Sequence, residues 1–241
     1  MEIVLEEMEP SDGVRISRPG LFRRLVMSQY IRQNALLFGA NVLSGVVAYL
    51  LHPLLGHLMG LVKYGTVASL LALSSVLLTP VQITSTIASK YASALSATGN
   101  LAQLNALIRR LMMILLPVGI IAALVFTAAS KYIATFFHLS ASQGVLWLGL
   151  VFIVAFAAPI NLGALQGLQR FGWLAFITFL PLFLRLVLTA ALVLLGLGVS
   201  GAILAIVIAT IITYLVSFQP LRSMLRGARA SIGPLRPVWS Y

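Results

Sequence analysis

The sequence predicts an all-α membrane protein with six transmembrane helices, and three features predict this class: composition, apolar runs and charge distribution. Of the 241 residues, 60% are hydrophobic and 9% are charged, and the mean hydropathy is +1.04. A soluble domain of this length needs much more charge to cover its surface. The apolar residues form long continuous runs, whereas the strands of a membrane barrel show short alternating ones. The runs therefore predict helices.

Six runs reach the roughly 20 apolar residues that a helix needs to cross the hydrocarbon core of a membrane. In chain order, the predicted transmembrane helices are Asn34–Pro53, Thr66–Ala88, Leu111–Ala129, Gly144–Leu165, Trp173–Leu195 and Val199–Gln219. They divide the chain into a cytoplasmic polar leader (1–33) and a six-helix transmembrane lobe (34–219). Residues 220–241 follow as a basic cytoplasmic tail or the start of a linker between lobes.

The leader opens with an acidic tract, Met1–Asp12, and does not show the basic region and short apolar core of a cleavable signal peptide. Its second half, Arg18–Arg32, mixes arginines with apolar residues. Two interpretations stay open for this half. It is either a short helix on the inner membrane surface or a disordered tail.

Polar residues form stripes along several predicted helices. Asn41 lies on such a stripe of the first helix, and Gln82 lies on one of the second. The last helix carries Thr210, Thr213 and Ser217. Hydrogen bonding between helices is the simplest explanation for Ser and Thr. For the amides of Asn41 and Gln82, substrate binding is an equal alternative.

The connections between the helices also carry signals. The inner loop Lys90–Arg110 contains a turn at Ser96–Asn100 and then an amphipathic run, Leu101–Leu111. The third helix is nearly all apolar and is expected to face lipid. The outer loop Ser130–Gln143 carries aromatic residues that suit the membrane interface.

Glycines predict close contacts between helices and one tight turn. Gly163-x-x-x-Gly167, and similarly Gly56-x-x-x-Gly60, would let another helix come near. Gly196-Leu197-Gly198 predicts a tight outer turn between the last two helices.

The charge distribution predicts the orientation. If the N-terminus is cytoplasmic, all of the 16 basic residues except Lys63, Lys131 and Arg185 lie in or beside cytoplasmic segments. Such a bias is the positive-inside pattern, so both termini are expected on the cytoplasmic side of the cell membrane. The net charge of +11 then fits anionic lipid headgroups and does not suggest nucleic acid.

The distribution of acidic residues excludes several function classes. All five lie within the first 12 positions, and no carboxylate follows between Gly13 and Tyr241. Paired carboxylates for acid–base catalysis, Asp- or Glu-based metal sites and carboxylate proton relays therefore cannot be built in the predicted lobe. The three histidines do not form a convincing metal pair, and there is no cysteine. We predict no enzyme, no metal and no cofactor.

Arg185 is the strongest candidate for a substrate-binding residue. It falls near the middle of the fifth predicted helix, about 15 Å from either interface, which is too deep for its guanidinium to reach water. Thr178, Pro181 and Thr189 share its helix face. The face is expected to line a wet cavity that binds substrate through Arg185, Thr178 and Thr189. The alternative is an arginine bound to backbone carbonyls as a packing device.

Several segments resemble polysaccharide biosynthesis flippases of the multidrug, oligosaccharidyl-lipid and polysaccharide exporter superfamily. These segments are Asn41–Gly65, Ala88–Tyr91, Gly163–Gly172 and Arg185 with the following Gly-Leu-Gly turn. The resemblance covers roughly Arg32–Arg222. It implies two six-helix lobes around a cavity that opens alternately to either side, and a cargo with a prenyl tail and a pyrophosphate-linked glycan. This chain supplies one lobe, so a second six-helix lobe or a homodimer partner is expected.

The predicted function is therefore flipping or export of a lipid-linked oligosaccharide or polysaccharide precursor across the cytoplasmic membrane. An electropositive cavity with Arg185 and no carboxylate suits an anionic pyrophosphate. Two alternatives stay open: a lobe of a multidrug-type exporter, and a non-transporting membrane partner of a glycan-export complex. A membrane enzyme acting on prenyl lipids is disfavoured because acidic residues are missing.

Overall fold

A computed structural model describes residues 21–136 and 143–225, and all of its regular structure is helical. Its elements are α1 (Leu21–Met59), α2 (Leu61–Leu78), the 3-10 helix η1 (Thr79–Gln82), α3 (Ile83–Ala97), α4 (Leu101–Ala128), α5 (Ser130–Phe136), α6 (Gln143–Gly167), α7 (Phe171–Leu192), the wide helical turn η2 (Val193–Leu197) and α8 (Gly198–Leu225). The described residues contain no strand, which confirms the all-α class. The predictions for Met1–Asp12, for residues 137–142 and for residues 226–241 concern segments outside the described residues.

Five helical stretches of the described chain are long and apolar enough to cross a membrane. They are Ile31–Met59, Leu61–Ala97, Leu101–Ala128, Val145–Gly167 and Phe171–Arg222. The last stretch has 52 residues, which would extend about 78 Å as one straight helix, far beyond a hydrocarbon core of about 30 Å.

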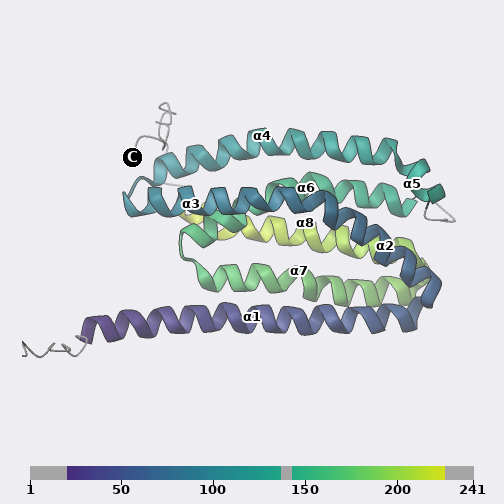
Figure 1. Cartoon of the computed structure of the whole chain (residues 1–241), viewed down its shortest axis with the longest axis horizontal. Helices are drawn as coiled ribbons and strands as arrows, with labels where there is room; N and C mark the ends of the chain where they lie inside the picture. The colour runs from purple at the N-terminus through teal and green to yellow at the C-terminus, as the bar shows by residue number, and fades with distance from the viewer. Residues whose placement is uncertain (1–20, 137–142, 226–241) are drawn as a thin grey trace, which may run out of the picture.

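The 52-residue stretch reverses direction at two glycines. Gly196 has φ 86° and Gly198 has φ 50°, in the left-handed region that glycine adopts without a steric penalty. As a result α7 and α8 pack side by side (Figure 1). The predicted tight turn at Gly196-Leu197-Gly198 is confirmed.

The helices are arranged so that α1 and α4 form opposite edges of the bundle (Figure 1). From one edge to the other, α1 packs on α7, α7 on α8, α8 on α6, and α6 on α4. Helix α3 packs on α6, whereas α2, before the kink at η1, contacts α1 and α8. The chain of α2 and α3 therefore crosses from one side of the bundle to the other. Its kink follows from Pro80, which has no N–H to donate within the helix.

Small residues allow α3 and α6 to touch at their backbones. A Cβ added to Gly163 would collide with the carbonyl oxygen of Ser85, and one added to Gly167 would collide with that of Ser89. The predicted close approach at Gly163-x-x-x-Gly167 is confirmed. At Gly56 and Gly60 nothing lies within 4 Å of an added Cβ, so the structure shows no close approach there.

Two helices, α1 and α4, begin many residues before their predicted transmembrane spans. Helix α1 starts at Leu21, so most of the Arg18–Arg32 segment continues the first helix and is not a separate surface helix or an unstructured tail. Helix α4 starts at Leu101, where the Asn100 side chain accepts a hydrogen bond from the backbone N–H of Gln103 at 3.2 Å. The amphipathic run Leu101–Leu111 is therefore the first part of α4.

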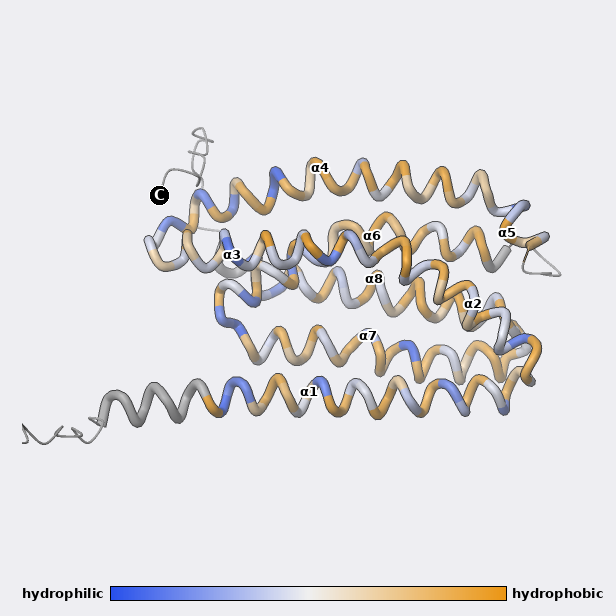
Figure 2. The backbone as a smooth tube through the Cα atoms, viewed as in Figure 1, coloured by the Kyte–Doolittle hydropathy of each residue, from blue (hydrophilic) through white to orange (hydrophobic). Residues whose placement is uncertain are grey.

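Hydrophilic residues gather toward one end of the bundle, where α3 turns into α4 and α6 turns into α7 (Figure 2). Exposed basic side chains of this half include Lys90, Arg109, Arg110, Arg170 and Arg222. The long middle parts of the helices are apolar. This distribution is typical of a membrane protein with a basic face on one side.

Candidate functional site

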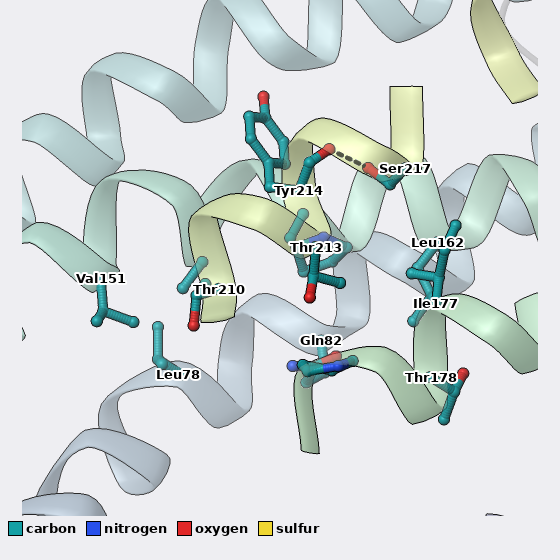
Figure 3. A pocket seen from close by; sticks show the side chains of 14 residues that line it. Leu78, Gln82, Val151, Leu162, Ile177, Thr178, Thr210, Thr213, Tyr214 and Ser217 are labelled. Atoms are coloured by element: carbon teal, nitrogen blue, oxygen red, sulfur yellow. Dashed lines mark hydrogen bonds between the residues drawn. The ribbon is translucent and has the colours of Figure 1, made fainter. Parts of the chain in front are cut away.

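A cavity of about 340 Å³ lies among four helical segments in the bundle. Its walls come from the α2–η1 kink, α6, α7 and α8, and its lining residues are Leu78, Gln82, Val151, Ala155, Ala158, Pro159, Leu162, Ile177, Thr178, Pro181, Thr210, Thr213, Tyr214 and Ser217. Figure 3 shows these side chains converging from segments that are far apart in the sequence. The volume is near the lower end of the roughly 300–1,000 Å³ range of small-molecule sites.

Three prolines shape the walls of this cavity. Pro159 of α6 and Pro181 of α7 line it, and Pro80 precedes the lining residue Gln82 by two positions. A proline inside a helix cannot donate to the carbonyl four residues earlier, which leaves the carbonyls of Ala155 and Ile177 without that bond. In a membrane, such carbonyls are tolerated where they face protein or a wet cavity.

Polar side chains reach the cavity from three sides. Gln82 comes from η1, Thr178 from α7, and Thr210, Thr213 and Ser217 from α8. In Figure 3, the hydroxyl oxygens of Thr210 and Thr213 point from α8 toward the side on which Gln82 lies. The cavity is therefore amphipathic, with aliphatic walls and a few polar groups that converge.

A buried polar contact fixes the relation between α6 and α8 beside the cavity. The amide of Asn161, which is fully buried, donates from Nδ2 to the Ser217 hydroxyl at 2.7 Å. The Ser217 hydroxyl donates in turn to the Tyr214 carbonyl oxygen at 2.6 Å. Asn161 Oδ1 has no hydrogen-bond partner among the described residues. The sequence interpretation did not single out Asn161, because a lone amide in an apolar helix gives no periodic signal.

The structure places two of the five predicted site residues in the cavity wall and a third one helical turn beyond it on α7. Gln82 and Thr178 line the cavity. Arg185 follows the lining residue Pro181 by one helical turn, about 6 Å along the axis of α7 and on the same face. Arg185 thus lies one helical turn beyond the lining residues of α7.

The other two predicted residues do not line this cavity. Asn41 is exposed on α1, the edge helix, although Ser44 is buried one helical turn further along. Thr189 lies on α7 but is 1% exposed, enclosed by the packing of its neighbours. Both have the helical spacing of a polar stripe, but the packing of the helices leaves Asn41 exposed and encloses Thr189.

Arg185 has no ionic partner in the described part of the chain. It is partly buried, and within residues 21–136 and 143–225 it makes neither a hydrogen bond nor an ion pair. Since no carboxylate follows Asp12 in the sequence, no acidic side chain of the helices can neutralise it. Within the described residues no backbone carbonyl accepts a hydrogen bond from its guanidinium, and whether Arg185 binds substrate or serves packing is a question for the transport test below.

Four lining residues of α8 were not among the predicted site residues. Thr210, Thr213 and Ser217 had a visible signal in their spacing of three and four residues, but the same spacing also suits contacts between helices. Tyr214 has the same spacing, four residues after Thr210 and three before Ser217, but the prediction counted only the Thr and Ser residues of this face. Only the position of α8 between α6 and α7 makes this face a cavity wall.

Comparisons with protein-family models, with characterised proteins and with solved structures find no match to this chain.

Proposed function

We propose that this chain is one six-crossing lobe of a transporter that flips or exports a lipid-linked oligosaccharide or polysaccharide precursor. The transport would proceed by alternating access across the cytoplasmic membrane of a bacterium or archaeon. The observation that carries the proposal is Arg185 on α7, one helical turn beyond the cavity residue Pro181, without any carboxylate in the helices.

Six crossings are supported by the lengths of the helices. Four of the apolar stretches have 23 to 37 residues, enough for one crossing each. The fifth reverses at Gly196 and Gly198, so that α7 and α8 supply two more. An even number of crossings puts both termini on the same side, and the basic end of the bundle favours the cytoplasm for that side (Figure 2).

An anionic cargo is supported by electrostatics. A guanidinium in a membrane-embedded site is strongly favoured beside a negative group, and its planar donors match a phosphate with two hydrogen bonds. A cationic drug would instead meet repulsion from Arg185 with no carboxylate to offset it. A phosphate-linked lipid headgroup is therefore the better cargo.

The test is transport by variants at Arg185. The 241-residue chain would be reconstituted at a protein-to-lipid ratio that allows copies to pair, with a fluorescent prenyl-pyrophosphate-linked sugar as cargo. Arg185→Ala should insert normally, because a central arginine costs about 2.5–3.5 kcal/mol on insertion scales, yet its flipping rate should fall to background. Arg185→Lys should keep part of the rate, since the charge stays while the two-pronged geometry is lost.

The matched control is Arg109→Ala, which removes an exposed arginine of α4, a helix that does not line the cavity. It should flip at the wild-type rate. Yield and flipping are measured on the same preparations. Normal yield together with normal flipping in Arg185→Ala would refute the cargo-binding role. Reduced yield with normal flipping in the surviving protein would assign Arg185 to packing instead.

A further inference from the structure

The threonine hydroxyl groups in the cavity already donate hydrogen bonds to backbone carbonyls of their own helices. Thr178 donates to the carbonyl oxygen of Leu174 at 2.8 Å, and on α8 Thr210 and Thr213 donate to carbonyls one turn back, each at 2.7 Å. A hydroxyl that donates in this way keeps its lone pairs as acceptors only. These three groups therefore offer acceptors to a ligand and no donors.

The other polar groups of the cavity wall also offer mainly hydrogen-bond acceptors. Ser217 also donates to its own helix and in addition accepts from Asn161. The lining residues Pro159 and Pro181 bring no backbone N–H donor of their own. The Tyr214 hydroxyl points away from Gln82 in Figure 3. Gln82 is then the one lining side chain in Figure 3 whose N–H groups can donate toward the cavity centre.

An acceptor-rich wall selects ligands that carry several O–H or N–H donors. Cations would satisfy it, but Arg185 stands one turn away with no carboxylate to compensate it. Uncharged polyols satisfy it without that repulsion. The aliphatic wall, which includes Leu162 and Ile177, suits the C–H face of a sugar ring, and a volume of about 340 Å³ suits one small ring better than a long chain.

We infer that the cavity binds an uncharged sugar ring by accepting hydrogen bonds from its hydroxyls at Thr178, Thr210 and Thr213. This deepens the proposed function and rests on it, because Arg185 would hold the phosphate end of the same cargo one helical turn away. In this arrangement the cavity binds the neutral glycan, and Arg185 binds the charged phosphate.

Binding of free sugars to the full chain in phosphatidylcholine nanodiscs tests this inference. The probes are methyl glucoside and N-acetylglucosamine, compared with tetramethylammonium and with a cyclohexane derivative of similar size without hydroxyls. Ligand-observed NMR saturation transfer should detect the sugars and neither comparison compound. Thr210→Val and Thr213→Val should each raise the dissociation constant of the sugars by roughly 2- to 10-fold, the effect of one lost hydrogen bond.

Three further variants separate binding from folding and from the proposed transport. Thr213→Ser keeps the hydroxyl and should bind as the wild type does. Thr66→Val removes a hydroxyl that also bonds one turn back, at 3.2 Å, but lies outside the cavity, so binding should not change. Arg185→Ala should lose flipping and keep sugar binding, whereas a wild-type chain that binds sugars but does not flip the lipid-linked cargo would count against the transport proposal alone. Binding of tetramethylammonium but not sugars, or unchanged sugar binding in both Val variants, would overturn the inference.

Discussion

Gly163 and Gly167 show how single residues set the spacing of two helices. An added Cβ at Gly163 would meet the Ser85 carbonyl and the Ala88 Cβ, and one at Gly167 would meet Ser89 and Ala92. Because these neighbours are backbone or short side chains, they cannot rotate away. Between helices in a membrane, close van der Waals packing of this kind replaces the hydrophobic drive of water.

We therefore predict that Gly163→Ala and Gly167→Ala each destabilise the bundle. Overpacking of this kind costs about 1–3 kcal/mol, which corresponds to a thermal midpoint roughly 3–10 °C lower for a chain of this size. The measurement is a thermal melt of purified protein in one detergent. Gly45→Ala is the matched control, because nothing lies within 4 Å of its added Cβ and alanine favours the helix. Equal midpoints for all three variants would contradict the contact.

At the scale of elements, the turns between helices allow a direct test of orientation. Ala97 ends α3 and is exposed at the basic end of the bundle, whereas Leu197, at the end of η2, is 47% exposed at the other. Leu197 suits a substitution better than its neighbours, since Gly196 and Gly198 have positive φ angles that strain other residues.

We predict that in intact cells Ala97→Cys is protected from a membrane-impermeant thiol reagent and Leu197→Cys is labelled. The reason is that the basic end of the bundle stays on the cytoplasmic side. The chain has no cysteine of its own, so the unmodified protein is a silent background. After permeabilisation both variants should react. Labelling of Ala97→Cys in intact cells would reverse the proposed orientation.

At the scale of the whole molecule, the edge helix α1 presents amides that have no partner among the described residues. Asn34 and Asn41 are exposed on it, whereas the exposed His52 already lies 2.9 Å from the Tyr64 hydroxyl. In water this would be an ordinary surface, but amides in a hydrocarbon environment need partners. A second copy of the chain, or a second lobe, would supply them.

We predict that a single copy does not transport. In liposomes loaded at increasing protein density, the fraction of flipping vesicles should follow the probability of two or more copies per vesicle. As a control, a tandem fusion of two copies should be active at one fusion per vesicle, which is feasible if both termini lie on one side. Flipping in vesicles that hold one unfused copy would refute the requirement for a partner.

The sequence by itself determined the features that depend on local composition. Apolar runs gave the helices, because a segment that crosses a membrane must satisfy its backbone internally. Gly196 and Gly198 gave the reversal, and Gly163 and Gly167 gave the close contact, because a missing side chain acts at its own position. The full length of α1 was not predicted, since hydropathy reports the apolar span and α1 continues beyond it to Leu21.

Only the tertiary structure decided which polar residues meet. Helical spacing placed Thr178, Arg185 and Thr189 on one face of α7, but it could not show that α1 packs on one side of that helix and α8 on the other. Gln82 reaches the cavity because the kink at Pro80 carries the chain past α6 and α8, while Asn41 lies on an outer edge. Periodicity marks a face that needs a partner. Which neighbour comes to that face depends on the packing of helices distant in the sequence, and no local pattern contains that information.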